Sequence, residues 1–241
     1  MKGKRVLVTG GGSGIGRAVA RAFAQAGAAV TIAGRRLDAL QETDDGRGMD
    51  CRVTDVTSEA SVKALFDKSY DVVVANAGVG KASRVANTSL QLWNDTIAVT
   101  LTGVFLTFRE ALAGMGKGGR LIAISSISGL HGEANVAAYS AAKHGVMGLV
   151  RSLALEIGKS GITCNAVCPG WVDTPMADEA VDGVMKRFAI SREEAQARVF
   201  GDLQVGRIVK PEEVAAAVLY LASPEAAMVN GHGLVISGGG E

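Results

Sequence analysis

The sequence has little of what defines disulfide-rich, nucleic-acid-binding or membrane proteins. It holds three cysteines, an odd number that makes no disulfide framework, and no apolar run long enough to cross a bilayer. Its 25 lysines and arginines balance 24 aspartates and glutamates, so the net charge of +1 provides no long-range attraction for nucleic acid or an anionic membrane. We therefore expect neither partner. Cys164 and Cys168 have no neighbouring histidine, which predicts reduced core cysteines in a cytoplasmic protein and no metal site.

The chain shows a regular alternation of short apolar runs with helical patterns. A hydrophobic content of 48% over 241 residues is enough for one large core. The apolar runs lack period-two alternation, which favours parallel strands covered by helices on both faces. The expected strands are residues 5–8, 29–33, 51–53, 72–75, 120–125, 162–167 and 234–236. The sequence therefore predicts an α/β protein, with a single domain over residues 1–241 and a doubly wound, seven-stranded parallel sheet.

A glycine-rich segment follows the first expected strand. Val6-Leu7-Val8 runs directly into Thr9-Gly10-Gly11-Gly12-Ser13-Gly14-Ile15-Gly16, and a helical pattern from Arg17 to Ala26 comes next. Glycines let the backbone approach a ligand closely, and the free amides and positive dipole of a new helix attract a pyrophosphate. The spacing differs from G-x-G-x-x-G and fits Thr-Gly-x-x-x-Gly-x-Gly. Strand, glycine turn and helix together predict a phosphate cradle.

A serine, a tyrosine and a lysine fall at spacings that suit one proton-transfer site. Tyr139 and Lys143 are one helical turn apart, so both side chains leave the same face of a helix. An ammonium beside a phenol favours the phenolate, which would bring the pKa of Tyr139 down toward neutral pH. The pair predicts a general acid and base, with the Ser126 hydroxyl holding the substrate oxygen.

These segments, in this order, resemble the short-chain dehydrogenase/reductase family in its ordinary length class. Two further motifs of that family are present, Asn76-Ala77-Gly78 after an apolar strand and Pro169-Gly170 followed by Trp171-Val172-Asp173-Thr174-Pro175. The resemblance covers nearly the whole chain. It implies a Rossmann-like fold and an oxidoreductase that transfers a hydride between a nicotinamide cofactor and a secondary alcohol or ketone.

The resemblance also assigns the chemistry and most of a cofactor site. Tyr139 would donate or remove the proton at the substrate oxygen, and Lys143 would bond the nicotinamide ribose. Asp55 and Val56, at the end of the third strand, would contact the adenine. The residues implied in cofactor binding are Gly10, Gly12, Ser13, Gly14, Ile15, Gly16, Arg35, Arg36, Asp55, Val56, Asn76, Ala77, Gly78, Tyr139, Lys143, Pro169, Gly170, Val172 and Thr174.

The end of the second expected strand bears on the choice of cofactor. Relatives that prefer NAD carry an acid there for the ribose hydroxyls, whereas this chain has Gly34 followed by Arg35 and Arg36. A guanidinium gives charge-assisted, bidentate bonds to a 2′-phosphate. We therefore expect NADP(H). NAD(H) is the alternative, because Ser13 stands where some NADP-binding relatives have a basic residue.

Thr100 departs from the family pattern, in which relatives have an asparagine. In those relatives the asparagine keeps a helix kinked around a water that links the lysine to solvent. A threonine hydroxyl can bond a backbone carbonyl or hold a water, but it lacks the second donor and the reach of the amide. The sequence thus predicts an active enzyme with an altered or slower proton relay. It leaves open a cofactor-sensing binding protein that turns over poorly.

Substrate contacts are expected between Trp171 and Gly206, where the family has a mobile helical lid. Apolar residues from Met176 to Ile190 indicate an inner face for that lid. The candidate substrate residues are Ser128, His131, Asn135, Trp171 and Met176. They favour an apolar or 3-oxoacyl-type ketone, with an NAD-dependent catabolic alcohol or hydroxyacid dehydrogenase as the alternative. Relatives usually form tetramers, so the resemblance implies a homotetramer.

Overall fold

The computed structural model describes residues 1–201 and 203–239, so Asp202, Gly240 and Glu241 of the expected domain and lid lie outside the described residues. Seven parallel strands form one sheet in the order β3-β2-β1-β4-β5-β6-β7. The strands are β1 (Arg5–Thr9), β2 (Ala29–Gly34), β3 (Asp50–Val53), β4 (Val72–Ala75), β5 (Arg120–Ile124), β6 (Thr163–Pro169) and β7 (Gly233–Ile236). Every expected strand is present, and the fold class is confirmed. The strand order reverses between β1 and β4, which opens a crevice at the carboxyl ends of the strands.

Helices fill the intervals between the strands. They are α1 (Gly14–Gln25), α2 (Leu37–Asp44), α3 (Glu59–Lys63), α4 (Leu90–Ile97), α5 (Gly103–Leu112), α6 (Ala137–Ile157), α7 (Pro175–Phe188), α8 (Arg192–Phe200) and α9 (Pro211–Ala222). A π-helical turn over Ala98–Thr102 joins α4 to α5. None of the helices formed by the described residues combines the length and apolarity that a bilayer crossing requires.

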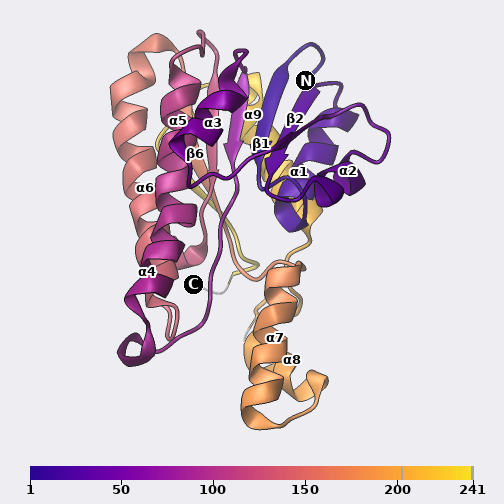
Figure 1. The fold of residues 1–241 in the computed structure, drawn as a ribbon, viewed down its shortest axis with the longest axis vertical. Helices are drawn as coiled ribbons and strands as arrows, with labels where there is room; N and C mark the ends of the chain where they lie inside the picture. The colour runs from indigo at the N-terminus through magenta and orange to yellow at the C-terminus, as the bar shows by residue number, and fades with distance from the viewer. Residues whose placement is uncertain (202, 240–241) are drawn as a thin grey trace.

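Alternate side chains of β1 pack against helices on opposite faces of the sheet. Val6 and Val8 join the core shared with α1 and α9, whereas Leu7 between them joins the core shared with α5 and α6. Phe108 of α5, which is fully buried, lies in that second core. Figure 1 shows the helices α4, α5 and α6 on one side of the molecule and α1 and α2 on the other. Because helices cover both faces, the central strands β4 and β5 are buried along their whole length. The edge strand β3 is only half-buried and contains Asp50 and Arg52.

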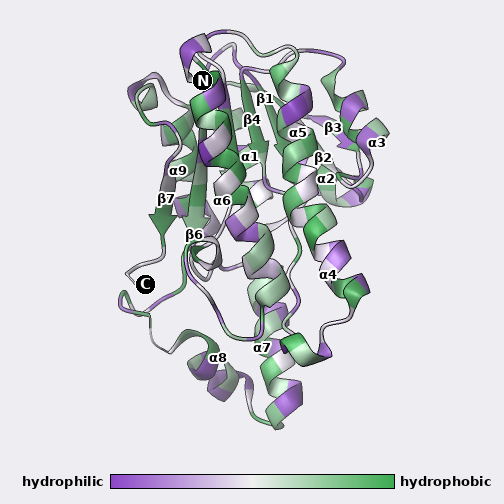
Figure 2. Ribbon diagram, turned by 90° about the vertical axis from the view of Figure 1, so that its left-hand side faces the viewer, coloured by the Kyte–Doolittle hydropathy of each residue, from purple (hydrophilic) through white to green (hydrophobic). Residues whose placement is uncertain are grey.

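The helices α7 and α8 project beyond the carboxyl ends of the strands, as Figures 1 and 2 show. A capping box starts α8: Ser191 Oγ accepts from the Glu194 backbone N–H, and the Glu194 carboxylate accepts from the Ser191 N–H. Arg192, next along, bonds Asp178 and Asp182 of α7. The two helices are therefore held to each other by polar contacts as well as by packing.

The expected apolar inner face of this lid is only partly right. Ala177 and Val181 of α7 are buried. Phe188 is 47% exposed, and the guanidinium groups of Arg187 and Arg198 lie 5.3 and 4.6 Å from its ring centre. A phenyl ring between two cations is stabilised without burial in a core, so its place could not be read from hydrophobicity alone.

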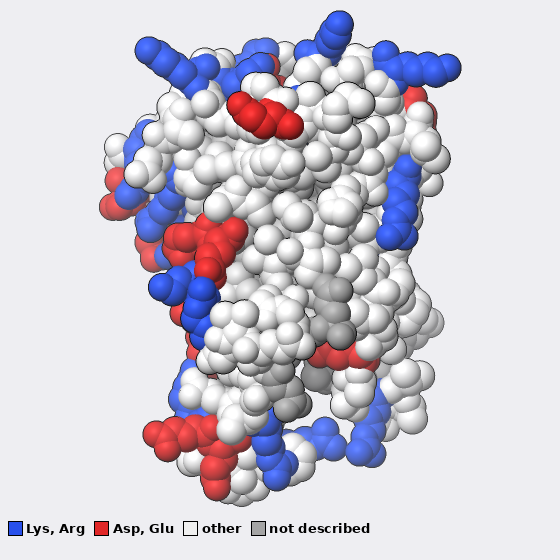
Figure 3. Space-filling model, turned by 180° about the vertical axis from the view of Figure 1, so that it is seen from behind, with Lys and Arg blue, Asp and Glu red and all other residues white. Residues whose placement is uncertain are grey.

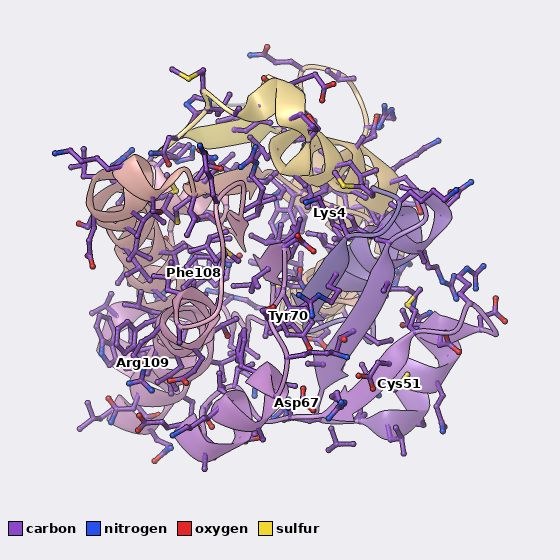
Figure 4. The ribbon with its side chains drawn as sticks, turned by 90° about the horizontal axis from the view of Figure 1, so that it is seen from above. Lys4, Cys51, Asp67, Tyr70, Phe108 and Arg109 are labelled. Carbon is purple, nitrogen blue, oxygen red and sulfur yellow. The ribbon has the colours of Figure 1, made fainter. Side chains whose placement is uncertain are left out.

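Ion pairs surround the opposite, amino edge of the sheet. Lys4 Nζ lies 3.1 Å from a carboxylate oxygen of Asp71, and an Arg52 nitrogen lies 3.2 Å from Asp67. Figure 4 looks down on the molecule from this end, with Lys4 and Asp67 labelled. Exposed pairs of this kind stabilise a protein by no more than about 1 kcal/mol each. The motifs singled out in the sequence lie at the other edge.

Two helical glycines provide a matched test of this packing. A Cβ on Gly16 would lie 2.2 Å from the Gly10 carbonyl oxygen, whereas a Cβ on Gly148 would meet nothing within 4 Å. We expect Gly148→Ala to raise the free energy of unfolding by about 0.5–1 kcal/mol, because alanine fits the helix and restricts the unfolded chain. Gly16→Ala should lower it by about 1–3 kcal/mol through overpacking. Urea unfolding measures both, and a stabilised Gly16→Ala protein would contradict the clash.

Candidate functional site

The glycine loop lies at the carboxyl end of β1 and leads into α1. Gly10 and Gly14 have φ angles of +66° and +49°, left-handed values that a side chain would strain. No acidic residue lies in the first turn of α1, and Ser13 at its N-cap makes no side-chain hydrogen bond. The first amides of α1 are therefore free for an anionic ligand. A closely packed glycine turn with unpaired helix amides fits the pyrophosphate of a dinucleotide.

Asn76 ties the glycine loop to the end of β4. Its Nδ2 donates to the carbonyl oxygens of Thr9 and Gly10 at 3.0 and 3.1 Å. The backbone N–H groups of Asn76 and Ala77 donate to Thr9 Oγ1 at 3.1 and 3.3 Å. The donors of the Asn76 amide are thus used within the protein. Their effect is to fix the loop beside Ala77 and Gly78.

The rim of the crevice carries Arg35, Arg36 and Asp55 at the ends of β2 and β3. The Thr57 backbone N–H and hydroxyl donate to Asp55 Oδ1 at 2.9 and 2.8 Å, and these bonds lower the pKa of Asp55. The charge of Arg35 lowers the pKa of Asp55 further, so Arg35 lies on the part of the crevice rim that carries Asp55. Arg36 lines a groove of about 410 Å³ beside the glycine loop. Both arginines are exposed, and neither makes an ion pair with another described residue. Val56, the other implied adenine contact, is 8% exposed, so only its backbone is placed to serve that role.

The segment after β6 lies against the glycine loop. β6 ends at Pro169, and the Gly170 N–H donates to the end of β7 at 3.0 Å. Thr174 is the N-cap of α7, and its methyl carbon would be 3.0 Å from a Cβ on Gly14. Val172 is buried in the core, so a ligand contact at this position would use its backbone. Of these predicted cofactor residues, Thr174 therefore lies directly against the glycine loop.

Ser126, Tyr139 and Lys143 come together between the end of β5 and the start of α6. Tyr139 and Lys143 share one face of α6, as their spacing predicts, with Lys143 Nζ 5.4 Å from the centre of the Tyr139 ring. Lys143 is 3% exposed and donates to the Ile124 carbonyl oxygen at 2.6 Å. Gly80 leaves room for the tyrosine, because a Cβ there would lie 2.9 Å from Tyr139 Cδ2.

Burial determines the protonation of this group. It raises the pKa of Tyr139 to about 12; a hydrogen bond with Ser126 opposes the shift, and the charge of Glu133 adds to it. Burial also lowers the pKa of Lys143 to about 8. The expectation that Lys143 lowers the pKa of Tyr139 is therefore wrong for the protein alone. The physical reason is that both groups lose their water and neither faces an opposite charge.

The Thr100 hydroxyl is fully occupied by the backbone of one residue. Its Oγ1 accepts from the Val79 N–H at 3.1 Å and donates to the Val79 carbonyl oxygen at 3.1 Å. Thr100 is completely buried in the π-helical turn between α4 and α5. Val79 follows Gly78, so this pair of hydrogen bonds fixes the helix to the segment after β4 that carries Asn76. The hydroxyl has one proton, and none is left for a water.

Three of the candidate substrate residues lie between Ser126 and Tyr139. Ser128 is 3% exposed in the turn after β5, and His131 and Asn135 are exposed on the loop before α6. Asn135 has a φ of +65°, and its carbonyl oxygen accepts from the Ser83 N–H at 2.6 Å. The loop is thereby paired with the segment that follows β4.

The other two candidates belong to the lid. Trp171 packs edge-on against Phe200 of α8, with ring centres 5.4 Å apart. Met176, in the first turn of α7, is 42% exposed. Trp171 thus anchors α8 to the body of the protein, and Met176 remains available to an apolar ligand.

The three cysteines form no disulfide bonds with each other. Cys51, Cys164 and Cys168 are free thiols, and burial raises the pKa of Cys164 to about 12 and that of Cys168 to about 11. Within residues 1–201 and 203–239, no three His, Cys, Asp or Glu side chains gather as a metal ion would need.

Sequence reasoning missed Glu133. Its Oε2 accepts from Ser128 Oγ at 2.7 Å, and its charge acts on Tyr139. It is the one acid between Ser126 and Lys143 in the sequence, and this was the signal available to find it.

A doubly wound parallel sheet with a glycine loop at its switch point defines the class of Rossmann-type dinucleotide-binding proteins. A family model described as "Enoyl-(Acyl carrier protein) reductase" matches residues 10–241. The chain belongs to the short-chain dehydrogenase/reductase family and is an oxidoreductase of that family.

Three similar proteins illustrate the relationship. The granaticin polyketide synthase putative ketoacyl reductase 1 of Streptomyces violaceoruber is 39% identical, over 97% of this chain and 91% of its own. The 3-oxoacyl-[acyl-carrier-protein] reductase FabG of Vibrio harveyi is 36% identical, over 99% of this chain and 98% of its own. A crystal structure of a variant actinorhodin polyketide ketoreductase with NADPH has a TM-score of 0.91 and 37% identity, over 98% of this chain and 96% of its own.

The buried lysine predicts how stability depends on pH. The pKa of Lys143 is about 8 in the folded protein against 10.5 for the free side chain, so the folded state binds fewer protons between these values. Stability from this group therefore rises as the pH increases from 8 to 10.5, by about 3 kcal/mol in total. Tyr139, Cys164 and Cys168 have raised pKa values and act in the opposite direction.

The difference between wild type and Lys143→Met isolates the lysine contribution. Urea unfolding across this pH range should show that difference moving steadily in favour of the wild type. A difference that does not change with pH would mean that Lys143 keeps its ordinary pKa.

Thr100 predicts a second effect on stability. Thr100→Val keeps the shape of the side chain and leaves the Val79 N–H and carbonyl without their partner. We expect the free energy of unfolding to fall by about 1–3 kcal/mol, and turnover to fall with it, because the strand end is no longer fixed to the helix. Thr100→Ser should retain both bonds. Thermal unfolding compares the stability of the two variants. Equal stability of Thr100→Val and Thr100→Ser would show that the hydroxyl contributes nothing to the free energy of unfolding.

Proposed function

We propose that the protein is an NADP(H)-dependent carbonyl reductase that converts a ketone to a secondary alcohol. The observation that carries the proposal is the convergence of Ser126, Tyr139 and Lys143 beside an anion-binding glycine loop. A single catalytic domain over residues 1–241, with the lid at about 171–206, is part of the proposal. The names of the ketoacyl and 3-oxoacyl reductases among its relatives support the reaction class.

The residues present suit the cofactor. The amides from Gly12 to Gly16 would hold the pyrophosphate, because they span the glycine loop and the first turn of α1, which contains no acid. Asp55 has one carboxylate oxygen, Oδ2, without a bond to Thr57, and this oxygen can accept from an adenine amine. Arg35, exposed on the same side, supplies a guanidinium for a 2′-phosphate. The NADPH bound to the similar ketoreductase supports the same choice.

Proton transfer would fall to Tyr139. The bound cofactor supplies the hydride that the carbonyl carbon receives. Tyr139 donates its hydroxyl proton to the carbonyl oxygen as negative charge develops there, and Ser126 helps to hold that oxygen. Lys143, fixed by Ile124, places a positive charge behind the tyrosine when it is protonated, which favours the phenolate left after transfer.

The lid supports an apolar ketone of the 3-oxoacyl type. Met176 is partly exposed at the start of α7, and thioether side chains adapt to varied apolar ligands. The two hydrogen bonds between Thr100 and Val79 hold the helix in place without an asparagine. This argues against the alternative of a cofactor-sensing binding protein that turns over poorly. The end of β2 has no acid for ribose hydroxyls, which argues against an NAD-dependent catabolic dehydrogenase.

A homotetramer is proposed as the assembly. Large apolar side chains are exposed on α4, α5 and α6, among them Leu90 at 74%, Phe105 at 43% and Leu155 at 87%. Exposed apolar surface of this kind is typical of an interface.

The surface in Figure 3 carries acidic and basic side chains interspersed, which supports a small-molecule substrate over nucleic acid. The free cysteines agree with the predicted cytoplasmic location.

The proposal predicts ketone-dependent loss of NADPH absorbance. We expect turnover of acetoacetyl-CoA or a bulkier ketone with NADPH, and a loss of at least ~100-fold in Tyr139→Phe, which cannot donate the proton. Arg35→Ser should raise the KM for NADPH and leave that for NADH unchanged, with Arg36→Ser as the matched comparison. Activity that survives in Tyr139→Phe would reject the assigned acid, and a preference for NADH would reject the role of Arg35.

A further inference from the structure

A chain of hydroxyl groups runs from the catalytic tyrosine to an acid on the surface. Ser126 opposes the rise in the pKa of Tyr139, which places its hydroxyl next to the phenol. Ser126 Oγ donates to Ser128 Oγ at 3.3 Å, and Ser128 Oγ donates to Glu133 Oε2 at 2.7 Å. The Ser128 backbone N–H also donates to Ser126 Oγ at 3.1 Å, which fixes the two serines relative to each other.

The carboxylate sets the direction of every bond in this chain. An ionised Glu133 can only accept, so the proton of Ser128 points toward it. Ser128 must then accept from Ser126. The Ser128 N–H occupies one lone pair of Ser126, and the other is left for the hydroxyl of a neutral Tyr139. The network is therefore ordered from Tyr139 outward.

The two serines of this hydrogen-bonded chain are buried, whereas its last residue, Glu133, is exposed. Ser126 and Ser128 are 9% and 3% exposed, whereas Glu133 is exposed on the loop before α6. Glu133 forms no ion pair with any described lysine or arginine, and Ser128 occupies only its Oε2. A buried pair of hydroxyls with a carboxylate at the surface has the arrangement of a proton relay.

The side chain of Thr100 does not supply a proton to such a relay. The single proton of the Thr100 hydroxyl is directed to the Val79 carbonyl oxygen, so Thr100 cannot donate to a water.

We propose that Ser126, Ser128 and Glu133 form the proton relay that connects Tyr139 with solvent, a proposal that rests on the proposed function. After Tyr139 gives its proton to the substrate oxygen, the Glu133 carboxylate takes a proton from solvent and passes it to Ser128. Ser128 gives its own proton to Ser126, and Ser126 gives its own to the Tyr139 phenolate. One O–H bond breaks in solvent and one each in Glu133, Ser128 and Ser126, while one forms in turn on Glu133, Ser128, Ser126 and Tyr139. Glu133 ends ionised again, and the net change is one proton drawn from solvent.

In the direction of alcohol oxidation the same groups work in reverse order. The Tyr139 proton passes to Ser126 while the Ser126 proton passes to Ser128 and the Ser128 proton to the Glu133 carboxylate. The resting orientation of the hydroxyls is already the one that this outward transfer needs. For inward transfer, the two serine hydroxyls first rotate.

Two variants interrupt the relay at different points. Glu133→Gln removes the terminal acid on an exposed loop, and Ser128→Ala removes the middle hydroxyl with almost no change in volume. We expect each to lower kcat by roughly tenfold, less than the ~100-fold loss expected for a missing general acid, and Glu133→Gln to leave the KM for the ketone unchanged. Imidazole added at constant pH and ionic strength should restore kcat in both, because a small acid can protonate the site directly.

The controls remove the same chemical groups elsewhere. Ser140→Ala deletes a buried hydroxyl, one residue from Tyr139, that bonds no other described residue, and Glu156→Gln deletes an exposed acid of α6. Both should leave kcat unchanged. An equal loss in either control, or a loss in the relay variants that imidazole does not restore, would overturn the relay in favour of a packing effect.

A measurement without turnover tests the link between Glu133 and Tyr139. An ultraviolet titration of the protein without cofactor, with Tyr139→Phe identifying the transition, gives the pKa of Tyr139. Burial raises that pKa most, and the charges of Glu133 and Cys168 add to the rise while Ser126 opposes it. Glu133→Gln should therefore lower the pKa and Glu156→Gln should not. An unchanged pKa in Glu133→Gln would overturn the link.

The outcomes separate the relay from the function on which it rests. Ketone reduction that needs Tyr139 but is unaffected by Glu133→Gln and Ser128→Ala overturns the relay alone. A wild type that reduces no ketone with either cofactor overturns both.

Discussion

The site depends on the hydrogen bonds with which Thr9 and Asn76 bind the glycine loop to the end of β4. This clamp joins the two strands at the point where the strand order reverses. The residues that follow Asn76 extend it: Val79 is bonded twice to Thr100, and Gly80 lies against the Tyr139 ring. Segments far apart in the sequence are thereby fixed relative to one another by hydrogen bonds between short side chains and the backbone. The position of the tyrosine does not then depend on a flexible side chain.

Much of this arrangement follows from the sequence because it rests on local rules. Val6-Leu7-Val8 and Val72–Ala75 are short apolar runs, and such runs form buried parallel strands when helices cover both faces. The glycine loop is recognisable because a strand, a tight turn and a helix are adjacent in the chain. Tyr139 and Lys143 are close for the same reason, since one helical turn separates them.

The parts that could not be predicted depend on contacts between distant residues or on solvent. Nothing in the sequence indicates that the Thr100 hydroxyl meets both backbone groups of Val79, because the pairing follows from how the π-helical turn packs. Glu133 reads as an ordinary surface acid until the turn after β5 brings Ser128 to it. Phe188 reads as a core residue, but two arginines hold it at the surface. The pKa of Tyr139 depends on how much water is lost around it, and local spacing carries no information about that loss.

The electrostatics of the carboxyl edge are incomplete without a ligand. The net charge of the chain is only +1, yet this edge gathers a helix N-terminus without an acid and two exposed arginines. Among the described residues the arginines have no ion-pair partner, and the Lys143 ammonium is bonded to the Ile124 carbonyl alone. The pKa of Lys143, about 8, measures the cost of keeping its charge away from water. An anionic ligand beside it would raise that pKa again, and by linkage the charged lysine would strengthen binding of the ligand. A lysine that becomes fully charged then favours the phenolate form of Tyr139. The raised pKa of Tyr139 is therefore the value for the ligand-free protein, and the lowering expected from its neighbour belongs to the complex.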